Sequence, residues 1–390
     1  LLYSLYGVSY QVFAEANRRP TGLLFVAGES GAMKTSVCRV FYTMFNADED
    51  HSPMQFNSTL ASLDPAIGDA KDTILLLDDF CPQLDKPYEV RKHMKELLER
   101  IIRIYGDGSS RRKSSTEYKL HVAPRATGGA VITGEMTAEG RSSCLRLITI
   151  ELKKGDISRE KLSVFQDDKT LWSSFLAHYI SFLEKNYTSI VQMIVGSYQE
   201  YRGEARGWLS EARNVDHYVE LRIISDILCE FLSAYGMSEE TAEVLFKELD
   251  EGVRYHILKS ESMANQENPN LLLLEAVVRV LNDGSVKIAD NDKIYRNDIG
   301  YEGYKADDEV YVEENVLKDA IGAYLYSKYG EGKFDRKNLF KNLSTQFDVV
   351  RKIKNGACGY VYTGTITKNH NKISSVVIKL SKAEAILNKK

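Results

Sequence analysis

The chain has 390 residues, of which 43% are hydrophobic, and a formal net charge of −4 at pH 7. This length predicts two or three domains with substantial cores, and the small net charge means that any nucleic-acid surface must be local. No apolar run approaches the roughly 18–20 residues of a membrane span, and the given sequence does not open with a charged n-region and a cleavage site. The five cysteines are widely separated, which argues against a disulfide framework or a zinc site and favours the cytoplasm.

A helical stripe over residues 1–16 precedes an apolar run at residues 23–27, which predicts a buried strand. The loop that follows reads Gly28, Glu29, Ser30, Gly31, Ala32, Met33, Lys34, Thr35 and Ser36. Such a loop directs backbone N–H groups to a polyphosphate at a helix N-terminus, where Lys34 reaches the β- and γ-phosphates and Thr35 binds Mg²⁺. Met33 stands where this pattern has its second glycine, and a chance loop that carries a lysine is the alternative.

The next apolar run, residues 73–77, predicts a strand that ends in two carboxylates, Asp78 and Asp79. Parallel sheets are buried on both faces and place their chemistry at the carboxyl ends of their strands. We therefore expect Asp78 to hold Mg²⁺ together with Thr35, and Asp79 to activate the attacking water of a nucleoside triphosphatase. Many such enzymes have glutamate at the second position. The alternative is a buried strand that ends in two solvated aspartates.

A helix is expected over residues 87–105, and a Gly-Asp-Gly segment ends it. The basic residues Arg111, Arg112 and Lys113 follow, and a strand-like stretch at residues 118–122 comes next, so we expect a hairpin or an exposed loop. A solvated loop is the ordinary interpretation of such a charge run. The functional alternative is contact with a nucleic-acid backbone.

Residues 129–135 predict another buried strand, and Thr133 near its polar end is a candidate sensor of the γ-phosphate. Arg141 follows, and then a strand expected at residues 144–152, which contains Arg146. An arginine in this position is well placed to reach a nucleotide on a neighbouring subunit, where a guanidinium can accelerate hydrolysis roughly 10³–10⁵-fold. For both residues an ordinary surface arginine is the alternative.

Helices expected between residues 171 and 258 predict a lid-like bundle. Arg213 precedes the third of these helices and is expected either to reach back to the phosphates or to stay in solvent. A polar linker at residues 261–270 then marks a change in composition.

Two helices between residues 313 and 347 and a hairpin at residues 360–380 predict a winged helix-turn-helix domain. Lys368 and Lys372 lie in the expected turn of that hairpin, as candidate nucleic-acid contacts. From residue 331 to the end the chain has 13 Lys/Arg and 4 Asp/Glu, an excess of 13 − 4 = +9 in a chain of net charge −4. This asymmetry favours DNA or RNA as the partner, and a protein-contact module is the alternative.

Together these pieces resemble an AAA+ P-loop ATPase, and more narrowly the helicase-like ATPases of bacterial mobile elements and phages. That group includes the replicative helicases of staphylococcal cassette chromosomes, which are related to the MCM proteins. The resemblance rests on residues 28–36, 75–80, 105–112, 132–135 and 146–148. It implies an α/β fold with a parallel-sheet AAA+ core at residues 1–165, a helical lid at residues 166–262 and a basic winged-helix domain at residues 263–390.

The resemblance also implies a hexameric ring, in which Arg141 or Arg146 acts in trans and the Arg111–Lys113 hairpin grips DNA in a central pore. We therefore expect an ATP- and Mg²⁺-dependent helicase or translocase that acts on single-stranded or forked DNA in the replication of a mobile element or phage, with a loader or primase as a further partner. The alternative is an initiator or helicase loader that ATP switches without unwinding. A small-molecule kinase is disfavoured, because the lid and the basic end would then have no purpose.

Overall fold

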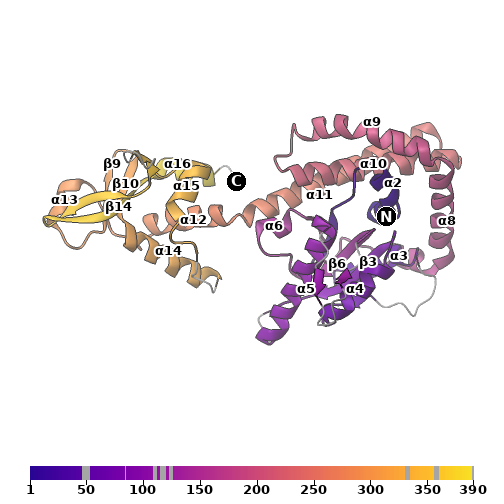
Figure 1. Ribbon diagram of the computed structural model, residues 1–390, viewed down its shortest axis with the longest axis horizontal. Helices are drawn as coiled ribbons and strands as arrows, with labels where there is room; N and C mark the ends of the chain where they lie inside the picture. The colour runs from indigo at the N-terminus through magenta and orange to yellow at the C-terminus, as the bar shows by residue number, and fades with distance from the viewer. Residues whose placement is uncertain are drawn as a thin grey trace. The chain divides into compact units, whose positions relative to one another are not determined.

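The computed structural model describes residues 1–45, 53–83, 85–108, 112–114, 120–122, 126–329, 334–354 and 360–388. The chain forms two compact units, Leu1–Asn265 and Gln266–Lys390 (Figure 1). No helix within the described ranges has both the length and the apolar character needed to cross a membrane.

A five-stranded parallel sheet lies within the first unit. Its strands are β1 (Leu23–Ala27), β2 (Met54–Gln55), β3 (Ile74–Phe80), β6 (Gly129–Gly134) and β7 (Leu147–Glu151), in the spatial order β2-β3-β6-β1-β7. Because these strands run parallel, the carboxyl ends of β1, β3 and β6 lie side by side at one edge of the sheet. The predicted strands at residues 23–27, 73–80 and 129–135 are confirmed to within one residue.

Helices cover both faces of this sheet, which explains why its strands are apolar without alternation. The helices are α1 (Leu2–Val8), α2 (Tyr10–Glu15), α3 (Lys34–Tyr42), α4 (Leu60–Asp69) and α5 (Tyr88–Asp107). Val26 and Leu76 are buried with residues of α1, α2 and α3. Phe25 and Leu77, their neighbours along the strands, are buried on the other face with residues of α4 and α5.

Further helices complete the first unit: α7 (Arg159–Asp167), α8 (Lys169–Lys185), α9 (Tyr187–Ala205), α10 (Ala212–Ala234) and α11 (Glu239–Gln266). Buried residues of α8, α9 and α10 belong to the same apolar cluster as Val26. The chain remains helical through residues 261–266, where we expected a polar linker. Glu261 is buried there and accepts a hydrogen bond from the backbone N–H of Ser210 at 2.9 Å. Its carboxylate therefore links α11 to the segment before α10 within this unit.

The strand expected from residue 144 begins only at Leu147. Residues Arg141–Cys144 instead form a short helix, α6, and the N–H of Leu145 donates to the carbonyl of Arg141 at 3.0 Å in the helical pattern. Arg146 therefore precedes β7 and does not lie within it.

The basic segment after α5 forms a hairpin, one of the two structures expected for it. Strands β4 (Arg112–Ser114) and β5 (Leu120–Val122) pair antiparallel, with Arg112 opposite Val122. Arg111 lies outside the described residues, and the structure describes Arg112 and Lys113 by their backbone.

The second unit contains a second five-stranded sheet. Its helices are α12 (Pro269–Asn282), α13 (Asp292–Asn297), α14 (Glu314–Tyr329), α15 (Leu339–Phe347) and α16 (Leu380–Leu387). Its strands are β8 (Ile288–Ala289), β9 (Gly303–Ala306), β10 (Glu309–Glu313), β13 (Gly364–Lys368) and β14 (Asn371–Lys379), in the order β13-β14-β10-β9-β8. A separate pair joins β11 (Ile353–Lys354) to β12 (Tyr360–Val361). Buried residues of α12, α14, α15 and α16 pack against β10 and β14 on one face of the sheet, and Tyr295 of α13 is buried with residues of the other face.

The C-terminal hairpin turns more tightly than expected. Strands β13 and β14 remain paired up to Lys368 and Asn371. Only Asn369 and His370 form the turn, with φ angles of +47° and +68°, as in the two-residue turns that match the twist of a hairpin. Lys368 and Lys372 consequently lie in strands, not in a loop.

Candidate nucleotide site

The loop at residues 28–33 connects the carboxyl end of β1 to the first turn of α3. The N–H of Gly28 donates to the carbonyl of Gly134 at the end of β6, at 3.1 Å. A Cβ on Gly28 would lie 2.1 Å from the carbonyl oxygen of Leu152, so the neighbouring backbone excludes any side chain. Gly31 has a φ of +84°, a conformation that favours glycine. Steric constraints of the backbone therefore explain why both of these loop positions are glycine.

Met33 occupies the position of the expected second glycine and keeps the backbone geometry that a glycine would have. Its φ and ψ are +59° and +23°, and it is the N-cap residue of α3. A left-handed conformation costs an L-residue about 1–2 kcal/mol. The thioether of Met33 is only a weak acceptor and does not cap the helix, so the first N–H groups of α3 are left without a side-chain cap and suit an anion.

Three side chains from different elements meet beside this loop. The hydroxyl of Thr35, in the first turn of α3, donates to Asp78 Oδ1 at 2.7 Å. The hydroxyl of Thr133, which is only 1% exposed on β6, donates to the same carboxylate oxygen. Because β6 lies between β1 and β3, it places Thr133 between the loop and the acid. The structure thus brings together three residues that the sequence separates by about a hundred positions.

Lys34 lies against the loop that precedes it. Its ammonium donates to the carbonyl of Gly28 at 2.7 Å and to that of Glu29 at 3.0 Å. Glu29 also pairs with Lys154, which follows β7, with 3.3 Å between Oε2 and Nζ. A Cβ placed on Gly31 would lie 3.3 Å from Cε of Lys154, so this second cation lies beside the loop. Sequence reasoning missed Lys154, whose only signal is its place just after a predicted strand.

Asp79 is exposed at the end of β3. The pairing of β3 with β6 shifts register between Leu77 and Phe80, and Asp79 adopts a φ of +67° within this bulge. Its backbone N–H donates to the hydroxyl of Thr133 at 3.3 Å. The bulge therefore holds the backbone of Asp79 beside Thr133 while its carboxylate stays accessible to water.

Glu135 is a third carboxylate at this edge of the sheet, and sequence reasoning gave it no separate role. Its N–H donates to the carbonyl of Phe80 at 3.0 Å. Its carboxylate accepts hydrogen bonds from the amide of Gln83 and from Cys81 Sγ, the latter at 3.5 Å. Burial raises the pKa of the Cys81 thiol, and the hydrogen bond to Glu135 acts in the same direction. The sequence signal for a role of Glu135 was its position two residues after Thr133, at the end of the same strand.

The residues at this edge fit a nucleoside triphosphate and Mg²⁺. The uncapped N-terminus of α3 and the ammonium of Lys34 suit phosphate oxygens. Among the described residues no three His, Cys, Asp or Glu side chains are grouped to hold a metal by themselves. Thr35 and Asp78 therefore suit Mg²⁺, which commonly takes one or two protein ligands and completes its shell with phosphate oxygens and water.

Arg141, in α6, pairs with Glu211 at the start of α10. Its Nε is buried and has no hydrogen-bond partner among the described residues. Arg141 therefore keeps unused donor capacity.

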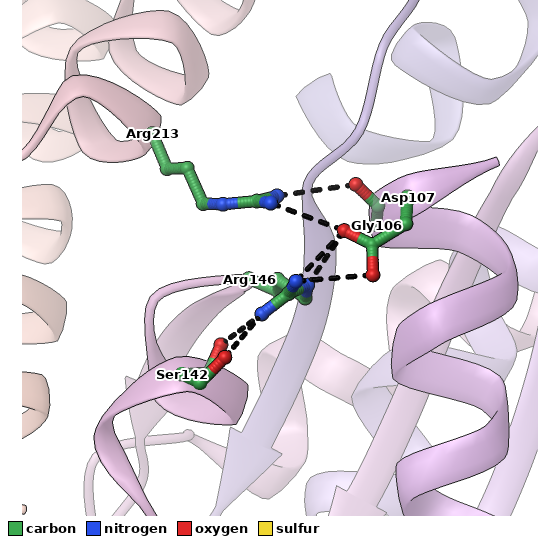
Figure 2. A network of polar contacts seen from close by, with 5 residues as sticks. All are labelled: Gly106, Asp107, Ser142, Arg146 and Arg213. Atoms are coloured by element: carbon green, nitrogen blue, oxygen red, sulfur yellow. Dashed lines mark hydrogen bonds and ion pairs between the residues drawn. The ribbon is translucent and has the colours of Figure 1, made fainter. Parts of the chain in front are cut away.

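Arg146 and Arg213 converge on the C-terminal end of α5, as Figure 2 shows. Arg146 binds both carboxylate oxygens of Asp107, from Nε at 3.0 Å and from NH2 at 2.8 and 3.0 Å. Arg213 donates to Asp107 Oδ1 at 3.0 Å and to the carbonyl of Gly106 at 3.1 Å. Partial burial acts to raise the pKa of Asp107, but the two guanidinium groups outweigh it and hold that pKa below its ordinary value.

The structure does not bring Arg213 to the phosphate loop of its own chain. The carbonyl of Arg146 accepts the N–H of Leu23, the first residue of β1, whereas the loop follows Ala27 at the other end of that strand. Five residues of strand span about 16 Å. Arg146 and Arg213 therefore lie at the amino edge of the sheet, away from Lys34.

The two lysines expected to contact nucleic acid differ in their surroundings. Lys368 is 11% exposed and pairs with Glu313 at 3.0 Å. Its ammonium also donates to the carbonyl of Tyr301 and lies 5.1 Å from the ring centre of Tyr295. The charge of Lys368 is therefore paired within the second unit, and its contact with nucleic acid stays a prediction. Lys372 is exposed at the start of β14.

No family model and no curated protein sequence matches the chain. Its fold is similar to that of a solved structure, SCCmec type IV Cch, described as an active helicase. The likeness has a TM-score of 0.59 and 12% sequence identity, and it covers 98% of this chain and 68% of the other. At this identity the comparison concerns the fold: a mixed α/β chain whose first unit carries a five-stranded parallel sheet of the kind found around phosphate loops.

Proposed function

We propose that the chain is an ATPase that couples hydrolysis to movement along DNA or to its unwinding. The observation that carries the proposal is the contact of Thr35 and Thr133 with one oxygen of Asp78. It joins the loop, the acidic end of β3 and the polar end of β6 at a single point. The alternative, a chance glycine loop that carries a lysine, gives no reason for these three segments to meet through polar side chains.

Each side chain of the site has a role in this proposal. ATP, bound with Mg²⁺, supplies the phosphoanhydride bond that hydrolysis breaks. Lys34 neutralises charge on the β- and γ-phosphates, while Thr35 and Asp78 hold the metal ion. Asp79 accepts a proton from the attacking water. Thr133 reports the state of the γ-phosphate, because its hydroxyl contacts both Asp78 and the backbone of Asp79.

We further propose an AAA+ assembly, a hexameric ring, in which an arginine completes the site of the neighbouring subunit. Arg141 and Arg146 are the candidates. Arg141 pairs with Glu211 and Arg146 with Asp107, so either guanidinium would have to leave its partner to reach a neighbouring subunit. The resemblance at residues 146–148 supports Arg146.

The second unit is proposed as a winged-helix module that binds DNA. Its helices α14 and α15 precede the hairpin β13–β14, and β14 pairs with β10, the strand before α14. The hairpin β4–β5 of the first unit, which carries Arg112 and Lys113, is proposed as a second DNA contact. A loader or primase is a further proposed partner.

A second candidate function is an ATP-switched initiator or helicase loader that does not unwind DNA. The observation that favours it is Asp79, whose side chain is one methylene shorter than the usual glutamate. Slow hydrolysis with ATP-dependent duplex binding distinguishes this function from DNA-stimulated turnover.

The proposed active site is tested by the Lys34→Ala variant. We expect turnover to fall by at least about 10²-fold, because the developing negative charge on the phosphates loses its preorganised cation. The control is Lys95→Ala, since Lys95 is an exposed lysine of α5 that pairs with the exposed Glu139. Lys95→Ala should hydrolyse ATP as the wild type does. Equal turnover of Lys34→Ala and Lys95→Ala would refute the assignment.

A further inference from the structure

The phosphate loop, residues 28–33, has a different strand end on each side. It follows β1, and β1 lies between β6 and β7 in the sheet. Thr133 lies near the carboxyl end of β6, on the side of Asp78 and the proposed metal ion. Lys154 follows β7, and all these strands run parallel, so their carboxyl ends meet at the edge that carries the loop. Lys154 therefore reaches the loop from the side opposite the metal ligands.

A tight turn holds the backbone of Lys154 in place. The N–H of Asp156 donates to the carbonyl of Lys153 at 3.2 Å, which closes a turn of four residues. Asp156 Oδ2 accepts the N–H of Lys153 at 2.8 Å, so the turn is closed a second time. Gly155, its third residue, has a φ of +97°, which glycine supplies at this position of a β-turn. Lys154 thus occupies the second position of a well-defined turn just after the sheet.

The segment after β7 packs directly on the phosphate loop. The carbonyl oxygen of Leu152 lies where a Cβ of Gly28 would be, at 2.1 Å from it. Further along, a Cβ on Gly31 would lie 3.3 Å from Cε of Lys154. The ammonium of Lys154 then pairs with Glu29, with 3.3 Å between Nζ and Oε2. The Lys154 side chain therefore lies along the loop, from Gly31 to Glu29.

The ion pair of Lys154 and Glu29 is one that can exchange easily. The two side chains are 60% and 59% exposed, and exposed ion pairs contribute little to stability because water and salt screen them. A phosphate group carries more negative charge than a carboxylate and offers more acceptor oxygens. A phosphate chain on the loop is therefore a stronger partner for Lys154 than Glu29 is.

We propose that Lys154 is a second phosphate-binding cation of this site, which exchanges Glu29 for the α- and β-phosphates of the nucleotide. Mg²⁺ bridges the β- and γ-phosphates, so the γ-phosphate lies on the side of Asp78 and Thr133. Lys154 approaches from the other side and meets the phosphates that ADP shares with ATP. This inference rests on the proposed function, because it takes the loop as the nucleotide site.

The experiment measures the affinities for MgADP and for the Mg²⁺ complex of the non-hydrolysable ATP analogue AMP-PNP. Lys154→Ala should weaken both by about tenfold, because each nucleotide loses a charge-assisted contact. Lys154→Arg keeps the charge and should stay within about threefold of wild type. The matched control is Lys153→Ala, which removes the same charge from the adjacent exposed residue. It should stay within about twofold of wild type.

A second comparison separates contact with phosphate from neutralisation of Glu29. Glu29→Gln breaks the same ion pair but frees Lys154, so it should tighten both nucleotides by about two- to threefold. The double variant Glu29→Gln with Lys154→Ala has no acid left to neutralise. It should nevertheless bind both nucleotides at least about fivefold more weakly than Glu29→Gln. A double variant that binds as tightly as Glu29→Gln would show that Lys154 serves only to neutralise Glu29, and would overturn the inference.

The other outcomes separate this inference from the function on which it rests. A wild type that binds neither nucleotide overturns both. A wild type that binds nucleotide without hydrolysing ATP refutes the motor, and the affinities of the variants still decide on Lys154. A loss confined to AMP-PNP would place Lys154 at the γ-phosphate and overturn its assignment, as would an equal loss in Lys153→Ala. Thermal unfolding is recorded for each variant, and if Lys154→Ala does not fold, Lys154→Gln decides.

Discussion

Met33 and Asp79 both adopt left-handed backbone conformations at the candidate nucleotide site, with φ angles of +59° and +67°. Such strain in a non-glycine residue persists only where the surrounding structure imposes it. For Met33 the start of α3 imposes it, and for Asp79 the bulge of β3 beside β6 does. Two of the eight non-glycine residues with positive φ among the described residues therefore lie at the sheet edge to which we assign the chemistry.

Met33 offers a direct test of this strain. Met33→Gly should leave the free energy of unfolding unchanged or raise it by up to about 1 kcal/mol, because relief of the left-handed strain outweighs the extra entropy of glycine in the unfolded chain. Met33→Val should lower it by about 1 kcal/mol or more, since a β-branched residue fits this conformation poorly. Urea denaturation measures both. A Met33→Gly protein less stable than Met33→Val would show that the loop conformation is assigned wrongly.

Lys368 and Lys372 form a matched pair for separating stability from binding. Lys368→Ala should lower the free energy of unfolding by about 2 kcal/mol, because it leaves the carboxylate of Glu313 without its buried cation. Lys372→Ala should change stability by less than about 0.5 kcal/mol. If Lys372 contacts a phosphate, its loss lowers DNA affinity and reduces the slope of log affinity against log salt by about 1. Urea denaturation and salt titrations of DNA binding check these outcomes, and equal stability losses would contradict them.

At the scale of elements, ion pairs hold the C-terminal end of α5: Asp107 pairs with Arg146, before β7, and with Arg213 of α10. The pKa of Asp107 is held below its ordinary value of 3.8. A folded carboxylate with a lowered pKa binds fewer protons than the unfolded one, so its contribution to stability is present above the ordinary pKa and is lost as the pH falls.

The ion pairs of Asp107 with Arg146 and Arg213 should therefore give a pH-dependent difference in stability between wild type and Asp107→Asn. We expect wild type to be the more stable protein from pH 7 down to about pH 5, with a constant difference. Below pH 3.8 the difference should narrow as Asp107 is protonated. Urea denaturation across this range measures it. A difference that stays constant down to pH 3 would mean that the charge of Asp107 does not contribute.

The sequence predicted those elements whose signals are local. Apolar runs predicted β1, β3 and β6, and the glycines followed by Lys34 and Thr35 predicted the loop between β1 and α3. The start of β7 was misplaced, because Cys144 and Leu145 look like strand residues but are buried in and just after a helical turn. The tight turn at Asn369 and His370 was also missed, since neither residue is glycine.

The partners of the charged side chains could not be predicted, because they come from distant parts of the chain. Asp107 meets Arg146 across 39 positions and Arg213 across 106. Lys368 meets Glu313 across 55. A run of basic residues gives no indication of which members are already paired. At the candidate nucleotide site the sequence named Thr35, Asp78 and Thr133, but only the fold shows that both threonines bind one oxygen of Asp78.

At the scale of the whole molecule, the proposed ring requires that an arginine of one subunit completes the active site of its neighbour. Lys34→Ala and Arg141→Ala subunits should each be inactive alone, and a mixture of the two should recover turnover. A complete site then forms where the intact loop of one subunit meets the intact arginine of the other. Turnover of the mixture against that of each parent is the measurement. The same mixture made with Arg146→Ala distinguishes the two arginines, and no recovery with either would contradict action in trans.

The central claim is that this site hydrolyses ATP in response to DNA. It is tested most directly by ATP turnover with and without single-stranded DNA, on the wild type and on Asp79→Asn, with the mass of the assembly recorded in the same buffer. We predict that turnover rises with DNA in the wild type and falls by at least about 10²-fold in Asp79→Asn, which lacks the proposed general base. Nucleotide binding without turnover in the wild type would contradict the motor and favour the ATP-driven switch.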